Sequence, residues 1–297
     1  MSTKLSIGYI GLGHMGGPMA RRLVRAGHKV HVCGRDPQRL RPLLDAGAKQ
    51  CVSPRQVSER AEIVFTCVTD VAAMEAVVFG EDGIASSGRQ GGMVIDMSTI
   101  SPDATVRMAQ ALEVRCGMHW IDAPVSGGPP ASEAGTLAIM VGGAPEDIER
   151  ARPFFDELGR ATRMGPVGAG QKTKLINQIL VFCGMALVAE AFGLASRLGL
   201  DLEALPKALS GGRADSRVLQ DYWPRLVIED YQPTSSVRSA LKDFAFVHAA
   251  AQQVGAFMPI TALVTELNRS IAGQNFAEED INAVYRLYRP GGVSTPK

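Results

Sequence analysis

Short apolar segments alternate with helical patterns through the first half of the chain. Candidate strands lie at 5–10, 29–33, 62–67, 93–95 and 119–121. Between them, apolar residues recur three and four positions apart, which is the spacing of an amphipathic helix. Strands that alternate with helices predict βαβ units and a parallel sheet. A further pair of strands, at 136–141 and 161–164, is predicted to flank a helix over 145–158.

The second half of the chain has a helical pattern almost to its end. One long helix is predicted from about Gln171 to Leu198, where Gly199 is a stop signal. Shorter helices are predicted at 201–209, 216–227, 237–254, 259–272 and 278–288. We therefore expect an α/β domain over residues 1–164 and an all-α domain over residues 165–297, built around the one long helix.

Composition is that of a globular protein, with 46% hydrophobic and 21% charged residues in 297. The formal net charge of +1 gives no electrostatic reason to expect nucleic acid or a membrane surface as a partner. The five cysteines form no Cys-x-x-Cys pair, which favours free thiols, a reducing compartment and hence the cytoplasm. The uncharged stretch 175–189 is about 15 residues long, below the ~20 that a membrane span needs, so we expect a buried helix.

A glycine-rich hexapeptide follows the first predicted strand and precedes a helical pattern. Its residues, Gly11-Leu12-Gly13-His14-Met15-Gly16, match G-x-G-x-x-G. Gly11 would allow a tight turn, Gly13 would let the backbone approach a pyrophosphate, and Gly16 would let helix and strand pack closely. The phosphates would lie at the helix N-terminus, where unpaired N–H groups favour an anion. All six residues are therefore predicted to bind the cofactor of a Rossmann domain. The histidines show no metal-ligand spacing, and no metal is predicted.

The end of the second strand bears on the choice of dinucleotide. NAD-binding proteins usually place an acidic residue there to bind the ribose 2′-hydroxyl, but this chain has Gly34. Arg35 follows directly and could pair with a 2′-phosphate. The sequence therefore favours NADP. NAD stays possible because Asp36 could reach the ribose.

Five further motifs follow in order along the chain. They are 96–100 (Asp-Met-Ser-Thr-Ile), 122–128 (Asp-Ala-Pro-Val-Ser-Gly-Gly), 135–143 (Gly-Thr-Leu to Gly-Gly), 168–177 (Gly-Ala-Gly with Lys174 and Asn177) and Lys242-Asp243. With the glycine-rich loop they resemble the β-hydroxyacid dehydrogenase family, which includes 3-hydroxyisobutyrate dehydrogenase and tartronate semialdehyde reductase. The resemblance covers nearly the whole chain. It implies a fold like that of 6-phosphogluconate dehydrogenase, with an active site in the cleft between the two domains.

The same resemblance implies roles for single residues. Val68, Thr69, Thr99 and Lys242 would contact the cofactor. Ser126, Gly127 and Gly128 would hold the carboxylate of a small substrate, since exposed backbone N–H groups and a hydroxyl suit an anion. Two alternatives stay open: Ser98, Thr99 and Ser101 could only cap the helix that begins near Pro102, and the glycines could form a plain turn.

Lys174 lies near the start of the predicted long helix. Oxidation of an alcohol requires a base that takes the hydroxyl proton, and the same group returns it in reduction. Asn177 and Gln178, at i+3 and i+4, share a helix face with Lys174, and either amide could orient the substrate. Relatives often have Asn at the i+4 position, where this chain has Gln178, so both Asn177 and Gln178 stay candidates.

The resemblance therefore implies an NAD(P)-dependent oxidoreductase, with Lys174 as its general acid and base. It would interconvert a small β-hydroxyacid and its semialdehyde, of the 3-hydroxyisobutyrate, tartronate or succinic semialdehyde class. The alternatives are an imine reductase of the same fold and a non-catalytic dinucleotide-binding module. Lys174 counts against both, because such relatives generally lack it. We also expect a homodimer or homotetramer.

Overall fold

The computed structural model of the chain describes residues 6–87 and 89–289. It divides into two compact units, and the division falls between Lys174 and Leu175. The sequence placed the boundary after Met164. The difference arises because the first turn of helix α8 (Ala169–Arg197) packs against the sheet of the first unit, while the helix itself continues through the division.

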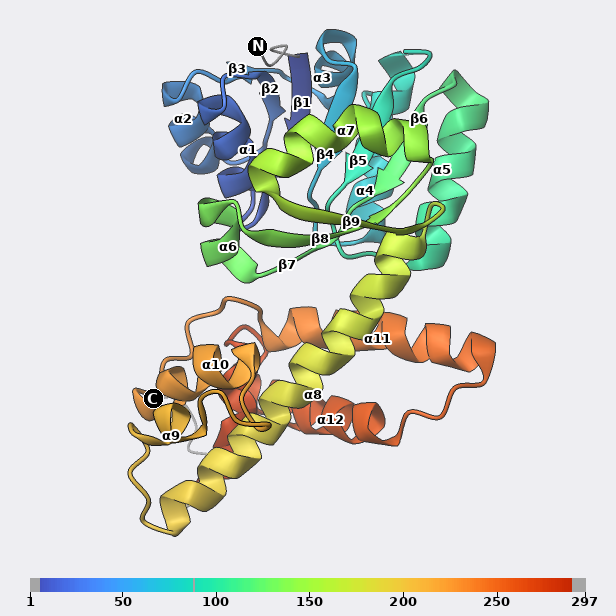
Figure 1. Cartoon of the computed structure of the whole chain (residues 1–297). Coiled ribbons are helices and arrows are strands. Elements are labelled where there is room, and N and C mark those ends of the chain that lie inside the picture. The colour runs from blue at the N-terminus through green and yellow to red at the C-terminus, as the bar shows by residue number, and fades with distance from the viewer. Residues whose placement is uncertain (1–5, 88, 290–297) are drawn as a thin grey trace. The chain divides into compact units, whose positions relative to one another are not determined.

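The first unit is a sheet of nine strands among the described residues, with helices on both faces (Figure 1). Its order is β3-β2-β1-β4-β5-β6-β8-β7, with β9 paired to β8. The strands are β1 (Ser6–Ile10), β2 (Lys29–Cys33), β3 (Lys49–Gln50), β4 (Ile63–Thr66), β5 (Met93–Asp96), β6 (His119–Asp122), β7 (Val125–Ser126), β8 (Leu137–Gly142) and β9 (Gly159–Gly165). The predicted strands agree to within a residue or two at each end. Leu5 lies outside the described residues.

The sheet is mixed rather than parallel throughout. The first six strands pair in parallel, but β8 runs antiparallel to β6 and β7. Between β7 and β8 the chain forms only the seven-residue helix α6 (Gly128–Ala134). A parallel crossover needs a dozen or more residues, so this connection turns the chain back instead. The parallel sheet predicted for the alternating strands is confirmed, and the antiparallel pairing of β8 is a departure that the sequence pattern did not predict.

Buried side chains on the two faces of the sheet contact different helices. Helices α1 (Gly16–Arg25), α2 (Pro37–Asp45) and α7 (Pro145–Leu158) cover one face, and α3 (Pro54–Arg60), α4 (Val71–Phe79) and α5 (Pro102–Cys116) cover the other. Successive residues of β4 alternate between the faces: Ile63 and Phe65 pack on the first face, and Val64 on the second. A strand that is buried on both sides must be apolar throughout, as the sequence pattern showed.

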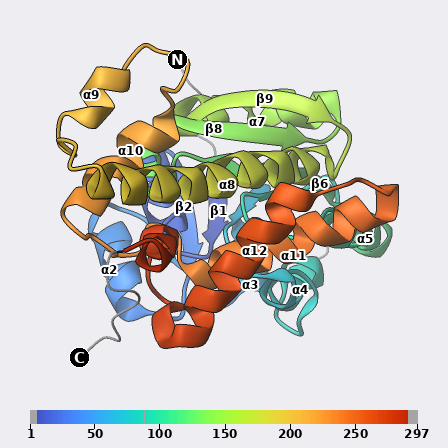
Figure 2. The same cartoon turned by 90° about the horizontal axis from the view of Figure 1, so that it is seen from below.

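The second unit is helical. After α8 come α9 (Leu205–Leu209), α10 (Arg217–Val227), α11 (Val237–Val254), α12 (Pro259–Ile271), a π-helical turn (Ala272–Phe276) and a 3-10 helix (Ile281–Leu287). Figure 2 shows α11 and α12 lying side by side. The core forms where aromatic rings of α8 meet later helices, as in the edge-to-face pair Phe182–Phe244.

Two predicted helices differ from the structure. The helix expected over 201–209 begins only at Leu205, because the Asp201 side chain accepts hydrogen bonds from the N–H groups of Glu203 and Ala204 and forms a turn. The α-helix expected over 278–288 is a 3-10 helix that starts after Asp280. The Asp280 carboxylate also accepts hydrogen bonds from Thr234, which ties this segment to the preceding loop.

By length and composition alone, α8 could cross a membrane, and it is the one helix among the described residues that could. Its 29 residues exceed the uncharged stretch that the sequence pattern marked out. A core helix passes the same test, and close to half of its most apolar window is buried in the protein. The absence of a membrane partner stays a prediction.

Candidate active site

The glycine-rich loop connects β1 to α1 in a conformation that requires glycine. Gly11 has φ +92°, and a Cβ atom there would lie 2.1 Å from the carbonyl oxygen of Cys67. A Cβ atom at Gly16 would lie 1.9 Å from the carbonyl oxygen of Gly11. At Gly13 the nearest atom would be Nη1 of Arg39, at 3.5 Å. The two outer glycines therefore serve close packing, while the middle one leaves the backbone accessible.

The start of α1 has the features of an anion site. Its N-cap residue is Met15, whose side chain makes no capping hydrogen bond. The first N–H groups of a helix need partners, and together with the helix dipole they favour a bound anion. His14 is exposed at the loop tip, whereas Leu12 is buried in the core against Gly34. The loop therefore fits the pyrophosphate of a dinucleotide, with Leu12 contributing only its backbone.

At the end of β2, the two charged residues differ in their surroundings. Arg35 is exposed. Asp36 caps helix α2: its carboxylate accepts a hydrogen bond from Gln38 N at 2.9 Å and lies 3.3 Å from Nε of Arg39. Arg35, the residue predicted to bind a 2′-phosphate, is therefore exposed. Asp36, the residue that could instead bind the ribose of NAD, already has Gln38 and Arg39 as partners.

Thr99 lies in the segment that follows β5, and its neighbours have separate structural roles. Ser98 Oγ accepts a hydrogen bond from Val68 N at 2.8 Å, which joins the two segments predicted to contact the cofactor. Ser101 supplies the N-cap of α5, accepting from Ala104 N. The cap is therefore made by Ser101 and not by Thr99, which is half-buried. Thr69 is exposed and hydrogen-bonds Asp70.

Two buried carboxyl groups lie opposite each other at the ends of β5 and β6. Burial raises the pKa of Asp96 to about 7, although hydrogen bonds from Ser98 and Thr66 favour the charged form. Burial also raises the pKa of Asp122 to about 6. The Asp122 carboxylate accepts hydrogen bonds from Gly168 N at 2.7 Å and Gln171 N at 2.8 Å, at the start of α8. Asp122 therefore binds the N-terminus of the long helix.

The predicted carboxylate-binding segment begins on β7. Ser126 is half-buried, and Gly127 and Gly128 have φ of +131° and +67°. A Cβ atom at Gly127 would lie 2.5 Å from that of Ala131, so the turn needs glycine. At Gly128 the nearest atom would be 3.7 Å away, which leaves its backbone accessible at the start of α6.

Lys174 is buried, with 7% of the residue exposed. Its Nζ donates a hydrogen bond of 2.7 Å to the carbonyl oxygen of Val125. That carbonyl belongs to the peptide that leads into Ser126. The structure therefore brings the predicted proton-transferring amine next to the predicted carboxylate-binding segment.

Asn177 and Gln178 lie further along α8 and are linked to each other. Asn177 Nδ2 donates to Gln178 Oε1 at 2.8 Å, and Gln178 Nε2 donates to the carboxylate of Asp243 on α11. Asp243 is buried and lies 3.3 Å from Nζ of Lys242. The Gln178 amide is therefore fixed by Asp243, while Asn177 is half-buried.

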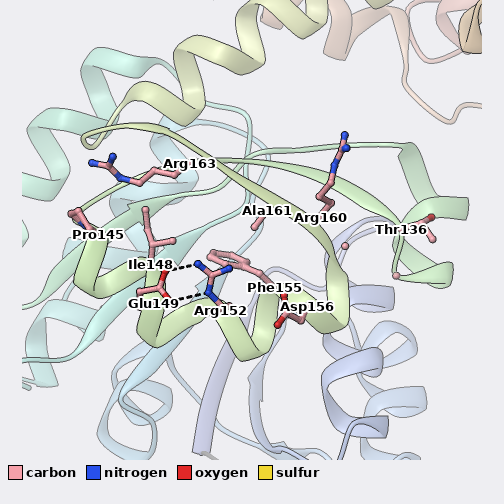
Figure 3. Close-up of a pocket in the computed structure, with 12 residues that line it drawn as sticks. Thr136, Pro145, Ile148, Glu149, Arg152, Phe155, Asp156, Arg160, Ala161 and Arg163 are labelled. Atoms are coloured by element: carbon pink, nitrogen blue, oxygen red, sulfur yellow. Dashed lines mark hydrogen bonds and ion pairs between the residues drawn. The ribbon is translucent and has the colours of Figure 1, made fainter.

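A separate hollow lies elsewhere in the first unit. It has a volume of about 740 Å³ and is lined mainly by α7 and β9. Its lining includes Ile148, Phe155, Ala161 and the ion-paired Glu149 and Arg152 (Figure 3). It shares no residue with the predicted site. Within residues 6–87 and 89–289, no group of three His, Cys, Asp or Glu side chains could hold a metal ion.

Comparisons with known proteins match both units. Residues 6–168 match the model for the NAD-binding domain of 6-phosphogluconate dehydrogenase. Residues 168–288 match the NAD-binding model of NADP-dependent 3-hydroxyisobutyrate dehydrogenase. The chain belongs to the β-hydroxyacid dehydrogenase family. It is therefore an oxidoreductase whose cofactor is a nicotinamide dinucleotide.

Members of this family resemble the chain over almost its whole length. It is 38% identical to 2-hydroxy-3-oxopropionate reductase of Escherichia coli, over 94% of this chain and 96% of that protein. It is 35% identical to 3-hydroxyisobutyrate dehydrogenase of Pseudomonas aeruginosa, over 95% and 98%. The crystal structure of 3-hydroxyisobutyrate dehydrogenase from Salmonella typhimurium superposes with a TM-score of 0.88 at 29% identity, over 95% of this chain and 99% of that one. These relatives favour a β-hydroxyacid dehydrogenase over the imine reductase alternative.

Sequence reasoning gave no role to Asp96, Asp122 or Gln171. A signal existed for the two aspartates, since each is a charged residue at the end of an apolar strand. Gln171 had no such signal, because the partners of its side chain precede it by more than 70 positions.

Proposed function

We propose that the protein interconverts a small β-hydroxyacid and its semialdehyde, with NADP preferred and with Lys174 as the group that transfers the proton. The observation that carries this proposal is the buried Lys174 amine, held 2.7 Å from the Val125 carbonyl oxygen at the entry to Ser126. The bound nicotinamide would take up or deliver the hydride. In oxidation, Lys174 accepts the proton of the substrate hydroxyl, and in reduction its ammonium group returns a proton to the carbonyl oxygen.

Substitution of Lys174 tests this role. We expect Lys174→Ala to lower kcat by roughly 10²–10⁴-fold while leaving the dissociation constant of NADPH close to that of the wild type. Lys172→Ala is the matched control, because Lys172 is an exposed lysine of the same helix turn. Near-normal turnover by Lys174→Ala, with an intact circular dichroism spectrum, would refute the proposal.

The NADP preference is supported by Gly34, by the exposed Arg35 and by the engagement of Asp36 with Gln38 and Arg39. Arg39 lies close to Gly13 and is a second cation for a 2′-phosphate. We expect Arg35→Ala to raise the KM for NADPH roughly tenfold and to leave the KM for NADH unchanged, because a charge-assisted hydrogen bond is lost. Arg41→Ala, on the outer part of α2, is the control. A wild-type kcat/KM that clearly favours NADH would contradict the preference.

The substrate class is inferred from the segment at Ser126–Gly128. Its accessible backbone at Gly128 and the Ser126 hydroxyl suit a carboxylate, as tartronate, methylmalonate and succinic semialdehydes each carry. A panel of these semialdehydes and of cyclic imines, each assayed by NADPH oxidation, would identify the class. We expect Ser126→Ala to raise the KM of the preferred semialdehyde. Turnover of imines alone would overturn the assignment.

We also propose a homodimer or homotetramer formed through α8. Large apolar side chains at Ile176, Leu180, Leu187 and Leu194 are each more than half exposed. They are four or seven positions apart, so they form one stripe along the helix. Monomeric soluble proteins rarely expose a long apolar stripe, and a second copy of the same helix is a partner of matching character.

A further inference from the structure

The side chain of Gln171 spans the residues on both sides of Thr99. Its Nε2 donates to the carbonyl oxygen of Ser98 at 2.8 Å, and its Oε1 accepts from Ile100 N at 3.3 Å. Gln171 is fully buried. One amide therefore satisfies the backbone groups that flank Thr99 and fixes the position of the segment predicted to meet the cofactor.

The backbone of the same glutamine is fixed by Asp122. Gln171 N and Gly168 N donate to the two oxygens of the Asp122 carboxylate. This close approach depends on glycine: a Cβ atom at Gly142 would lie 2.4 Å from Asp122 Oδ1, and one at Gly170 would lie 2.9 Å from Oδ2. The first turn of α8 is thus held at a separation that a larger residue would not permit.

Lys174 lies one turn after Gln171 on the same helix, and its amine binds Val125, three residues after Asp122. The first turn of α8 is therefore joined at one end to Asp122, at the other to Val125, and through the Gln171 amide to the Thr99 segment. A shift of this turn would therefore disturb both the position of Lys174 and the hydrogen bonds that hold the Thr99 segment.

We propose that Gln171 and Asp122 are positioning residues that fix Thr99 and Lys174 in a single geometry. Neither residue meets the reacting atoms; both act through the backbone and through Lys174. This inference rests on the proposed role of Lys174. Within the first unit, the pair links the Thr99 segment, predicted to contact the cofactor, to Lys174, proposed to transfer the proton.

Kinetics of three variants test the proposal. We expect Gln171→Ala, Gln171→Glu and Asp122→Asn each to lower kcat roughly 10²-fold at pH 8, because a displacement of about 1 Å can cost that much. The KM of the substrate should change far less. Gln220→Ala is the matched control, since Gln220 also donates its amide to a backbone carbonyl, that of Pro206, in the second unit.

Amide hydrogen exchange gives a readout that needs neither cofactor nor substrate. In the wild-type protein, Ile100 N–H is bonded to Gln171. We expect a peptide that covers residues 97–101 to exchange faster in Gln171→Ala, while a peptide from β1 exchanges at the wild-type rate. Unchanged exchange of the 97–101 peptide would overturn the proposal, because the amide would then not hold that segment.

Gln171→Glu adds a rescue by pH. A neutral carboxyl group can donate to Ser98 and accept from Ile100 as the amide does, whereas a carboxylate cannot donate. Burial favours the neutral form, and so do two nearby carboxyl groups: Asp96, which accepts from Ser98 N, and Asp122, which accepts from Gln171 N. The Lys174 amine and the start of α8 favour the charged form. We expect the ratio of variant to wild-type kcat to fall as pH rises from 6 to 9. A constant ratio would contradict the proposal.

Failure of this inference is distinguishable from failure of the proposed function. If Lys174→Ala is inactive but the folded Gln171 and Asp122 variants turn over at the wild-type rate, only the positioning role is wrong. If Lys174→Ala is active, the proposed function is wrong, and the exchange measurement still decides whether Gln171 holds the Thr99 segment.

Discussion

Asp96 gives the protein a pH-dependent stability that one substitution should remove. Its carboxyl group is fully buried at the end of β5. Oδ1 accepts hydrogen bonds from Ser98 N and from the Thr66 hydroxyl, whereas Oδ2 is buried and makes no hydrogen bond to the described residues. Asp96→Asn keeps the shape and the acceptor but cannot ionise.

The direction in which stability changes with pH follows from the pKa of Asp96 in the folded and unfolded states. Burial raises the pKa of Asp96 from 3.8 to about 7 on folding, so the folded protein binds the proton more tightly. The resulting stability is fully present below pH ~4 and is lost as pH rises through ~7. Between these two pKa values, each pH unit lowers the free energy of unfolding by about 1.4 kcal/mol, and above pH ~7 the loss levels off. The free energy of unfolding should therefore fall by roughly 3 kcal/mol between pH 5 and pH 8.

The variant should lose the contribution of Asp96 to the pH dependence and keep that of Asp122. Its amide NH₂ would replace Oδ2 and lack an acceptor, which costs about 1–3 kcal/mol at every pH. At pH 8 this cost is offset by the loss of the ionisation penalty of about 4 kcal/mol. We therefore expect Asp96→Asn to be less stable than the wild type at low pH and equally or more stable at pH 8.

Tryptophan fluorescence can follow the first unit alone. Trp120 lies on β6 in the first unit and Trp223 lies on α10 in the second, so a Trp223→Phe background isolates Trp120. Urea unfolding would be measured at pH 5, 6, 7 and 8 for the Trp223→Phe protein and for the same protein with Asp96→Asn. Asp122, with its pKa raised to about 6, is present in both proteins and so contributes to both curves. A difference in unfolding free energy that stays constant from pH 5 to 8 would refute the reasoning.

Three further variants have expected outcomes. Gly16→Ala should weaken NADPH binding strongly in a fluorescence titration, because the new Cβ would displace the Gly11 carbonyl; an unchanged dissociation constant would contradict the packing argument. Leu180→Glu with Leu187→Glu should convert the oligomer to monomer in sedimentation velocity, whereas a wild-type monomer at micromolar concentration would exclude the α8 interface. Ser101→Ala should cost about 1 kcal/mol through loss of the α5 cap and lower Tm by a few degrees in calorimetry.

Local signals in the sequence predicted most of the elements. The glycine-rich loop, the strand over 29–33 and the helices over 145–158 and 237–254 follow from periodicity and from turn or cap residues. Strands β3 and β7 were missed because two residues carry no period. The reversal at β8 was also missed, since it depends on the length of a connection rather than on the strand itself.

The contacts within the candidate site could not be predicted, because they join residues far apart in the chain. Gln178 meets Asp243 across 65 positions, and Gln171 meets Ser98 across 73. Neither pair has a spacing that a helix or a strand would impose. The family resemblance predicted the role of Lys174. It did not predict that the Lys174 amine donates to the Val125 carbonyl oxygen, because that contact forms only in the folded protein.

Strand β8, the antiparallel partner of β6 and β7, also constrains the length of the connection between β7 and β8. Asp122 faces Gly142, Val125 faces Ile139, and Ser126 faces Ala138, so one register continues across the break between β6 and β7. Inserting or deleting a single residue between Gly127 and Thr136 would force a bulge or slide β8 by one position. A slide would move Leu137, Ile139 and Val141 from the core that they share with α1 and α7 to the opposite face of the sheet. It would also move Gly142 away from the carboxylate it accommodates. Loop grafts and chimeras on this scaffold should therefore keep that connection at its present length.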